Sequence, residues 1–414
     1  MLNKKLVVTG SKLDMQYYSD ITPWTLDAET VSVVEENEHL GLVVAGSNEE
    51  EKNIDANIHK CRKSLFKHLG PAFAYKCLLP PAVQAHLWQV YSLPVLRSGL
   101  SSLPIRPATL GPLQTFQNKI LRSFLKLSNS SPIPALYFLL GELPIEGRLH
   151  LDLLSLFYTI WDNHDTTVHD IVKYLLQMAT DSSLTWSAHL RTICLKYNLP
   201  CPLKLLNSGN VWKKSEWSNL AKTNVTIYYE RTMRQQAMTN SKMQYLNVQV
   251  QGLSGTPHPA LRGINTTQDV LRLRHHIKFL SCDYLTAERL FRDNGSNPKC
   301  KLCHAPLETT EHVLTQCRAT ADIQSRMLPE LLNVVFSVHP TCEILDINKQ
   351  AQCLTQFLLD CTSLNLPTNC RVGAHNPRVG EIFSVSRNWC FAISRARTRL
   401  MKQLNEPQEN LKSK

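Results

Sequence analysis

The sequence predicts a mainly α-helical protein, in which a helical bundle follows a small N-terminal β-element and precedes a cysteine- and histidine-based metal module. Apolar residues recur at helical spacing over most of the chain, β-branched runs are confined to its start, and one Cys/His cluster has the spacing of metal ligands. With 414 residues, 43% hydrophobic and 19% charged, the chain is long enough to bury a substantial core.

Residues 1–47 carry the predicted β-element. Three β-rich runs occur there, KLVVTG, TVSVVEE and HLGLVVAG, and they predict two or three strands. Because a lone hairpin is only marginally stable in water, we expect these strands to border a larger structure. The chain therefore looks cut at its N-terminal end.

Residues 48–180 predict one compact helical unit. Ile54, Ile58, Cys61, Leu65 and Leu69 share one face of a first helix, which Gly70-Pro71 is expected to stop. A second helix places four apolar residues inward: Leu113, Phe116, Ile120 and Phe124. A third apolar-rich helix is predicted over 149–160, so the range has the size of a helical bundle.

Three further ranges complete the predicted organisation. Residues 181–265 are polar and contain weakly periodic helices with Trp186, Trp212 and Trp217, and they end in a predicted linker, GLSGTPHP, at 252–259. Residues 266–330 form the metal module. Residues 331–414 are predicted to be a C-terminal helical region.

The net charge and the cysteine content indicate which binding partners and which cellular compartment are compatible with the sequence. The net charge of +11 and pI near 9.0 favour polyanions such as RNA, DNA or an anionic membrane surface, and an ordinary basic surface stays an alternative. No secretory signal or membrane-spanning stretch is recognisable, and the 13 cysteines do not form the even set of a disulfide scaffold. We expect an intracellular protein, nuclear or cytoplasmic, with its remaining thiols, such as Cys61, Cys77, Cys194 and Cys390, in apolar or helical surroundings.

The metal cluster is formed by Cys300, Cys303, His312 and Cys317, in the pattern C-x2-C-x8-H-x4-C. Zinc takes four nitrogen or sulfur ligands at tetrahedral positions, and a C-x2-C turn lets two thiolates reach one ion. Thr309, Thr310 and Glu311 suit the start of a helix that holds His312 in its first turn. Because residues five apart do not share a face of a regular helix, we expect this helix to end or bend before Cys317.

Two alternatives stay open at this cluster. His304 directly follows Cys303 and is a competing nitrogen ligand, although its position would strain the turn. The four residues could also be buried thiols and a histidine that share a neighbourhood by chance. If they do bind zinc, four protein ligands leave no open coordination position, so the ion would be structural and not catalytic.

Basic residues at helical spacing are candidate phosphate contacts. They fall in three groups, which are Lys60, Arg62, Lys63 and Lys67; Arg272, Arg274 and Lys278; and Arg395, Arg399 and Lys402, with Arg397 on a different face. The alternative for each group is a solvated helix face. Trp88, Tyr91 and Trp389 could stack on bases, but aromatic residues at helical spacing are more often core. Acidic residues around the predicted hairpin should repel a polyanion there.

The segments RLRHHIKFLSCDYL and ETTEHVLTQC closely resemble the zinc-binding region that follows the reverse transcriptase domain of non-LTR retrotransposons, including its Thr-x-x-His-x4-Cys ending. ENEHLGLVVAG resembles the end of the polymerase palm in that family, and IDANIHKCRKSLFKHLG and LQTFQNKILRSFLKL resemble its thumb helices. The resemblance is loose over 1–180 and specific over 270–330. It implies a palm remnant, a thumb-like bundle and a zinc knuckle that bind RNA or DNA through backbone phosphates.

The sequence departs from that family in its catalytic residues. The polymerase reaction needs an aspartate pair and a third aspartate to hold two divalent metals, yet the chain contains no Asp-Asp pair, and Asp14, Asp20 and Asp27 are isolated. The resemblance therefore implies a chain that is no enzyme on its own, from a parent family of RNA-directed DNA polymerases. Part of an active polymerase whose catalytic half lies elsewhere, and a non-catalytic interaction scaffold from a decayed element, are the alternatives.

Overall fold

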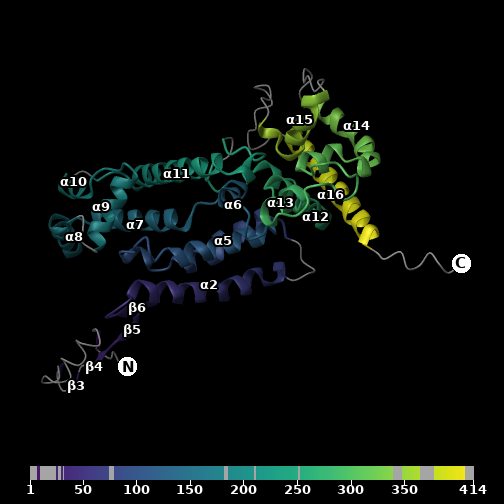
Figure 1. Cartoon of the computed structure of the whole chain (residues 1–414). Helices are drawn as coiled ribbons and strands as arrows, with labels where there is room; N and C mark the ends of the chain where they lie inside the picture. The colour runs from purple at the N-terminus through teal and green to yellow at the C-terminus, as the bar shows by residue number, and fades with distance from the viewer. Residues whose placement is uncertain are drawn as a thin grey trace. The chain divides into compact units, whose positions relative to one another are not determined.

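The structure is a computed structural model that describes the backbone of residues 7–9, 25–26, 29–30, 32–73, 79–180, 185–208, 211–249, 252–338, 347–363 and 377–405. These residues are mainly helical, as predicted, and Figure 1 shows the order of the elements. The chain divides into two compact units. Unit 1 comprises Met1–Gly70, Leu87–Gln117 and Pro144–Tyr228, and unit 2 comprises Pro71–His86, Asn118–Leu143 and Tyr229–Lys414.

Among the described residues, β-structure occurs only near the start of the chain, as predicted. β1 (Val7–Thr9) pairs in parallel with β4 (Ser32–Val34), and β2 (Thr25–Leu26) pairs with β3 (Glu29–Thr30). β5 (Glu36–His39) and β6 (Leu42–Ala45) form an antiparallel hairpin with His39 opposite Leu42. Leu40 and Gly41 connect them with φ values of 51° and 84°, which the tight turns of two-residue hairpins require.

Unit 1 is built around long helices. Its elements are α2 (Glu49–Phe73, up to Gly70), η1 (Trp88–Ser92), α4 (Leu93–Arg97), η2 (Leu100–Ser102), the first half of α5 (Gly111–Leu125), α7 (Ile145–Asp162), α8 (Thr167–Met178), α9 (Trp186–Lys196), α10 (Pro202–Asn207) and the first part of α11 (Lys214–Met238). The predicted apolar face of α2 is buried from Ile54 to Leu69. The expected stop at Gly70-Pro71 is wrong, because Gly70 does not take a positive φ and the helix continues to Phe73.

An aromatic cluster joins α7 to α11 inside unit 1. The rings of Trp161 and Trp217 meet edge to face at 5.8 Å between centroids, and Trp212 and Phe157 pack against them. The Trp217 indole also donates a hydrogen bond of 3.0 Å to the Leu154 carbonyl, which satisfies its buried N–H. Large aromatic surfaces and this hydrogen bond therefore fix the two helices that line the pocket described below.

Unit 2 contains the C-terminal helices. Its elements are most of α3 (Pro81–Leu87), the second half of α5, α6 (Ile133–Leu140), the end of α11, η3 (Ser241–Met243), η4 (Pro259–Leu261), α12 (Thr267–Leu280), α13 (Ala287–Asn294), η5 (His312–Gln316), η6 (Arg318–Thr320), α14 (Ala321–Val338), α15 (Ile347–Leu359), η7 (Cys361–Ser363) and α16 (Pro377–Asn405). α12 begins at a capping box formed by Thr266 and Asp269, which satisfies its first backbone N–H groups. α16 packs against both α12 and α14.

The segment 252–259, predicted to be a linker, is held within unit 2 by its buried residues, although Ser254, Gly255 and Thr256 are exposed. Leu253 and His258 are buried, and the Gly255 and His258 amides donate to the carbonyls of Gly141 and Leu139, each at 2.8 Å. Glycine and proline indicated correctly that the segment has no long helix. They do not show how the segment is held, which here depends on backbone hydrogen bonds to the end of α6.

The two units are assembled from interleaved stretches, whereas the sequence suggests five consecutive ranges. That five-part division stays a prediction. Within the described ranges, no helix combines the length and the hydropathy needed to cross a bilayer. Cys61, Cys194 and Cys390 are buried as expected, whereas Cys77, Asp14, Asp20 and Asp27 lie outside the described residues.

Candidate metal centre

A tight loop positions the first two cysteines. The Cys300 amide donates to the Ala305 carbonyl at 2.9 Å, and the His304 amide donates to the Cys300 carbonyl at the same distance. His304 takes a left-handed φ of 61°, a conformation that costs a non-glycine residue some strain. The chain thus folds back after Cys303, and Cys300 and Cys303 come to the same side of the loop.

A short helical turn positions the other two candidate ligands. The helical turn starts at Thr310, and the Thr309 hydroxyl accepts a hydrogen bond of 3.0 Å from the His312 amide, so Thr309 acts as the expected cap. The turn ends at Gln316, and Cys317 is extended with φ −69° and ψ 115°. The predicted end of the helix before Cys317 is confirmed.

The turn from His312 to Gln316 is a π-helix. In an α-helix, residues five apart would be separated by about 140° around the axis. The wider i→i+5 bonding of a π-turn brings such residues closer to one face. Together with the extended backbone at Cys317, this geometry explains how a five-residue spacing serves a single site.

The four ligand atoms converge. The Cys300 and Cys317 sulfurs are 4.0 Å apart, the Cys303 sulfur lies 3.3 Å from His312 Nε2, and the ligand atoms of all four residues lie within 4.8 Å of one another. A tetrahedral zinc site has edges of about 3.8 Å between two sulfurs and about 3.6 Å between sulfur and nitrogen. The group could therefore hold one metal ion. His304 is not part of this group.

Burial shifts the pKa values of three of the four candidate ligands, Cys300, His312 and Cys317. It raises the pKa of the Cys300 thiol to about 12 and raises the pKa of Cys317, whereas it lowers the pKa of His312. The His312 imidazole is therefore neutral at pH 7, which is the form that binds metals. The two buried thiols keep their protons until a cation displaces them, so metal binding at this site should release protons.

Glu308 anchors the module to α16, and sequence reasoning missed it. Its carboxylate is buried and pairs with both terminal nitrogens of Arg397, at 2.7 and 2.6 Å, and it also accepts a hydrogen bond of 2.7 Å from the Ala287 amide. The only sequence signal was the position of Arg397 on a different face from Arg395 and Arg399. Trp389 adds a hydrogen bond of 3.0 Å to the Leu314 carbonyl.

The predicted basic groups have different surroundings. Lys60, Arg62, Lys63 and Lys67 are exposed on α2, but Lys60 lies 3.4 Å from the Glu38 carboxylate of the hairpin, and Arg62 lies over the Phe116 ring. In unit 2, Arg272 pairs with Asp269 at 3.5 Å. Arg399 and Lys402 are exposed on α16.

The structure brings other basic residues together on unit 2. Burial lowers the pKa of His275, and repulsion from Lys278, Arg274 and Arg395 lowers it further. Burial and repulsion from Arg274 also lower the pKa of Lys126. We call this set the α12–α16 basic surface; it consists of Lys126, Arg274, His275, Lys278 and Arg395.

The Phe391 ring holds this surface together, since it contacts His275 edge to face at 5.4 Å and lies under the Arg395 guanidinium at 5.5 Å. Three of the sequence-predicted contacts, Arg274, Lys278 and Arg395, are thus neighbours although they come from two helices. The sequence analysis did not name Lys126 and His275 as candidate phosphate contacts. Lys126 lies far from α12 and α16 in the sequence, so spacing along a helix could not group it with them.

The candidate stacking aromatics divide as their spacing suggests. Trp88 and Trp389 are fully buried in the core, whereas Tyr91 is 45% exposed and stacks on His68 at 4.5 Å between centroids.

No protein-family model, no curated protein and no solved structure matches the chain.

Proposed function

We propose that the chain is a non-catalytic nucleic-acid-binding protein stabilised by one structural zinc ion, of the kind found after the polymerase domain of non-LTR retrotransposon reverse transcriptases. The convergence of Cys300, Cys303, His312 and Cys317 within 4.8 Å carries this proposal. It is the arrangement that the resemblance over 270–330 implies.

The donor set favours zinc over other metals. Three thiolates and one imidazole are soft and borderline ligands, which suit zinc and disfavour magnesium or calcium. All four positions are protein ligands, so the ion would not activate water. Its role would be to close the loop at 300–305 onto the helical turn at 312–316 and thereby to fix the module.

The metal module and the proposed binding surface share one helix. Arg397 of α16 points to Glu308 in the metal module, whereas Arg395, two residues earlier, lies on the α12–α16 basic surface. Loss of the metal should therefore loosen the segment against which α16 is anchored. Phosphate contacts of this type bind nucleic acid without reading its sequence.

A scaffold function is the second candidate, and α8 favours it. Five apolar residues of α8 are between 43% and 63% exposed, which are Val168, Ile171, Tyr174, Leu175 and Met178. A contiguous exposed apolar stripe is typical of a protein interaction surface. The basic row on α2 also has acidic neighbours in the β5–β6 hairpin, which weakens its attraction for phosphates.

Salt dependence of binding tests the proposal. The full chain should bind a 5′-labelled single-stranded RNA or DNA with an affinity that falls steeply as salt rises, because each phosphate contact contributes a slope of about −0.7 on a log–log plot. The variant Arg274→Gln/Arg395→Gln should bind more weakly and with a slope shallower by about 1.4. Lys204→Gln/Arg231→Gln removes the same charge from exposed sites elsewhere and should leave the slope unchanged. A flat salt response in the unaltered chain would instead support the scaffold.

A further inference from the structure

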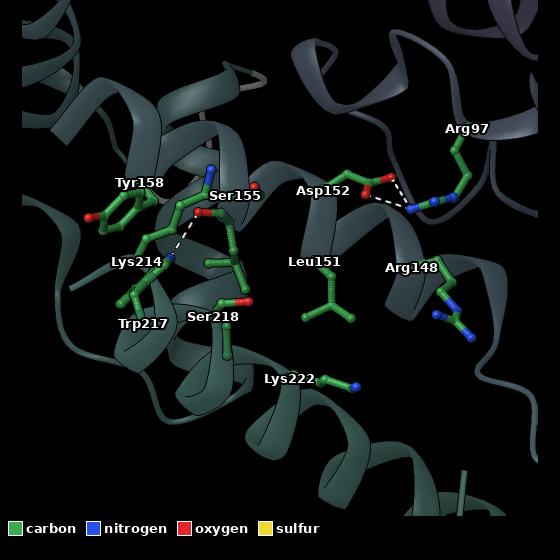
Figure 2. A pocket seen from close by; sticks show the side chains of 12 residues that line it. Arg97, Arg148, Leu151, Asp152, Ser155, Tyr158, Lys214, Trp217, Ser218 and Lys222 are labelled. Carbon is green, nitrogen blue, oxygen red and sulfur yellow. Dashed lines mark hydrogen bonds and ion pairs between the residues drawn. The ribbon is translucent and has the colours of Figure 1, made fainter. Parts of the chain in front are cut away.

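Unit 1 contains a pocket that the metal centre and the basic surface do not include. It has a volume of about 290 Å³ and lies between α7 and the first half of α11, with Arg97 at the end of α4 completing the wall (Figure 2). Its floor is apolar and includes Leu151, Leu154 and Trp217. The aromatic cluster around Trp217 holds both helices in place, so the pocket is preformed.

The lining of the pocket is strongly cationic. Four basic side chains line it, Arg97, Arg148, Lys214 and Lys222, against one carboxylate, Asp152. Arg97 Nη1 donates to both carboxylate oxygens of Asp152, at 2.5 and 2.6 Å. The lining therefore carries four formal positive charges against one negative charge, and Lys214 and Lys222 of α11 are exposed.

Hydroxyl groups accompany these cations. Ser155 of α7 and Ser218 of α11 line the same cavity, and Figure 2 shows Ser218, Lys222 and Arg148 arranged around the Leu151 side chain. Lysine ammonium, arginine guanidinium and serine hydroxyl groups are the donors that proteins use for phosphate oxygens. Cationic walls on a low-dielectric floor also concentrate the field inside a cleft.

We propose that this pocket binds a single nucleotide unit, with its phosphate ester against Arg148, Lys222 and Ser218 and its organic part on the apolar floor. A phosphate monoester carries a charge of about −1.5 to −2 at neutral pH, which suits the excess positive charge better than one carboxylate does. The volume lies at the small end of ligand pockets, which span about 300–1,000 Å³, and it therefore limits the occupant to one nucleotide.

This inference does not rest on the proposed function. All residues that line the pocket belong to unit 1, whereas the α12–α16 basic surface and the metal ligands belong to unit 2. Zinc removal or the Arg274→Gln/Arg395→Gln variant tests the proposed function and leaves the pocket residues intact. The two proposals can therefore fail separately.

Calorimetric titration of the full chain with adenosine 5′-monophosphate and with inorganic phosphate tests the pocket. The nucleotide should bind more tightly than inorganic phosphate, because only the nucleotide uses the apolar floor. Lys222→Gln should weaken nucleotide binding about tenfold, as expected for the loss of one charge-assisted contact. Lys222 is exposed, so this variant should fold. Lys204→Gln, an exposed lysine on α10 outside the pocket, should bind like the unaltered chain.

Competition identifies the source of the nucleotide. Two decanucleotides of one sequence are compared, one with a 5′-phosphate and one with a 5′-hydroxyl. If only the phosphorylated strand displaces the monophosphate, the pocket binds the end of a strand. Displacement by neither strand would assign it to a free nucleotide, and both results support the proposal. Equal affinity for the monophosphate and for inorganic phosphate would overturn it. So would a loss of affinity in Lys204→Gln as large as in Lys222→Gln.

Discussion

Arg397 and Glu308 form a buried, two-pronged ion pair, with distances of 2.7 Å from Nη1 to Oε2 and 2.6 Å from Nη2 to Oε1. Glu308 directly precedes Thr309, the cap of the helical turn that carries His312. The pair therefore ties α16 to the segment between the two halves of the candidate metal site. Because the geometry is bidentate and the Glu308 side chain is only 1% exposed, removing one partner leaves the other charge without compensation.

Arg397→Ala should lower the free energy of unfolding by about 3–5 kcal/mol, because it leaves the Glu308 carboxylate buried and unpaired. Urea denaturation of the zinc-loaded chain measures this. Arg395→Ala removes the same residue type from the exposed face of α16 and should change stability by less than about 0.5 kcal/mol. Equal effects of the two substitutions would show that the ion pair does not stabilise the fold.

The unaltered chain should contain about one zinc per molecule after purification, and Cys300→Ser or Cys317→Ser should release it. Zinc at a free concentration a hundredfold above its dissociation constant should stabilise the unaltered chain by about 2.7 kcal/mol. Atomic emission and thermal denaturation with and without a chelator measure both effects. Cys201→Ser, at an exposed cysteine, is the matched control, and full metal content in both ligand variants would disprove the site.

The choice between His312 and His304 as the nitrogen ligand can be tested directly. His312→Ala should reduce zinc affinity strongly, because His312 Nε2 lies 3.3 Å from the Cys303 sulfur. His304→Ala should retain the metal, and competition with a chromogenic chelator compares the two affinities. His304→Gly should even stabilise the loop modestly, since glycine accepts the left-handed φ at this position without strain. Metal loss in His304→Ala and not in His312→Ala would reverse the assignment.

The stability of the chain should decrease as the pH falls from about 6.5 to 4. Burial, followed by repulsion from Arg387, lowers the pKa of His276 to about 4, so the unfolded state takes up the proton first. The stabilisation is complete above the unfolded pKa and is lost as the pH falls toward the folded value; this shift corresponds to about 3 kcal/mol. His150, whose pKa burial lowers to about 3, acts in the same direction.

His276→Gln should flatten this pH dependence, because the amide can replace the hydrogen bond of 3.1 Å from Nε2 to the Leu358 carbonyl and does not titrate. Urea denaturation at several pH values between 7 and 4.5 gives the slope. His59→Gln changes an exposed histidine of α2 and serves as the control. A slope in His276→Gln that equals that of the unaltered chain would contradict the assignment.

Gly141→Ala should destabilise unit 2 more than Gly255→Ala does. Both glycines have a positive φ, 67° and 88°, but a Cβ at Gly141 would lie 2.3 Å from the Thr256 carbonyl oxygen, whereas a Cβ at Gly255 meets nothing within 4 Å. Both variants pay the conformational penalty of about 1–2 kcal/mol. Only Gly141→Ala must also displace the backbone of 252–259. Equal unfolding free energies of the two variants would show that residues 252–259 can move away from a Cβ at position 141 at little cost in free energy.

Several features of the fold were predictable because their causes are local. β-Branched runs predicted strands at the start of the chain, although not that Glu36–His39 forms one of them, and apolar spacing predicted the buried face of α2. At the metal centre, the side-chain types and their spacing predicted which four residues meet, and the helical cap and the end of the turn before Cys317 followed from propensity. The π-geometry of that turn was not predicted, because i→i+5 bonding leaves no distinct pattern in so short a segment.

The sequence by itself determined the helical character of the chain, its N-terminal hairpin and its four candidate metal ligands, since each depends on residues close together in the chain. Only the tertiary structure decided that Leu253 and His258 of the predicted linker are buried, that Arg397 reaches Glu308 across 89 residues, and that Arg274, Lys278 and Arg395 gather around His275. Periodicity shows which side of a helix is apolar, but it does not show which other helix will cover that side. That choice depends on packing between distant segments, and the pocket between α7 and α11 arises from it in the same way.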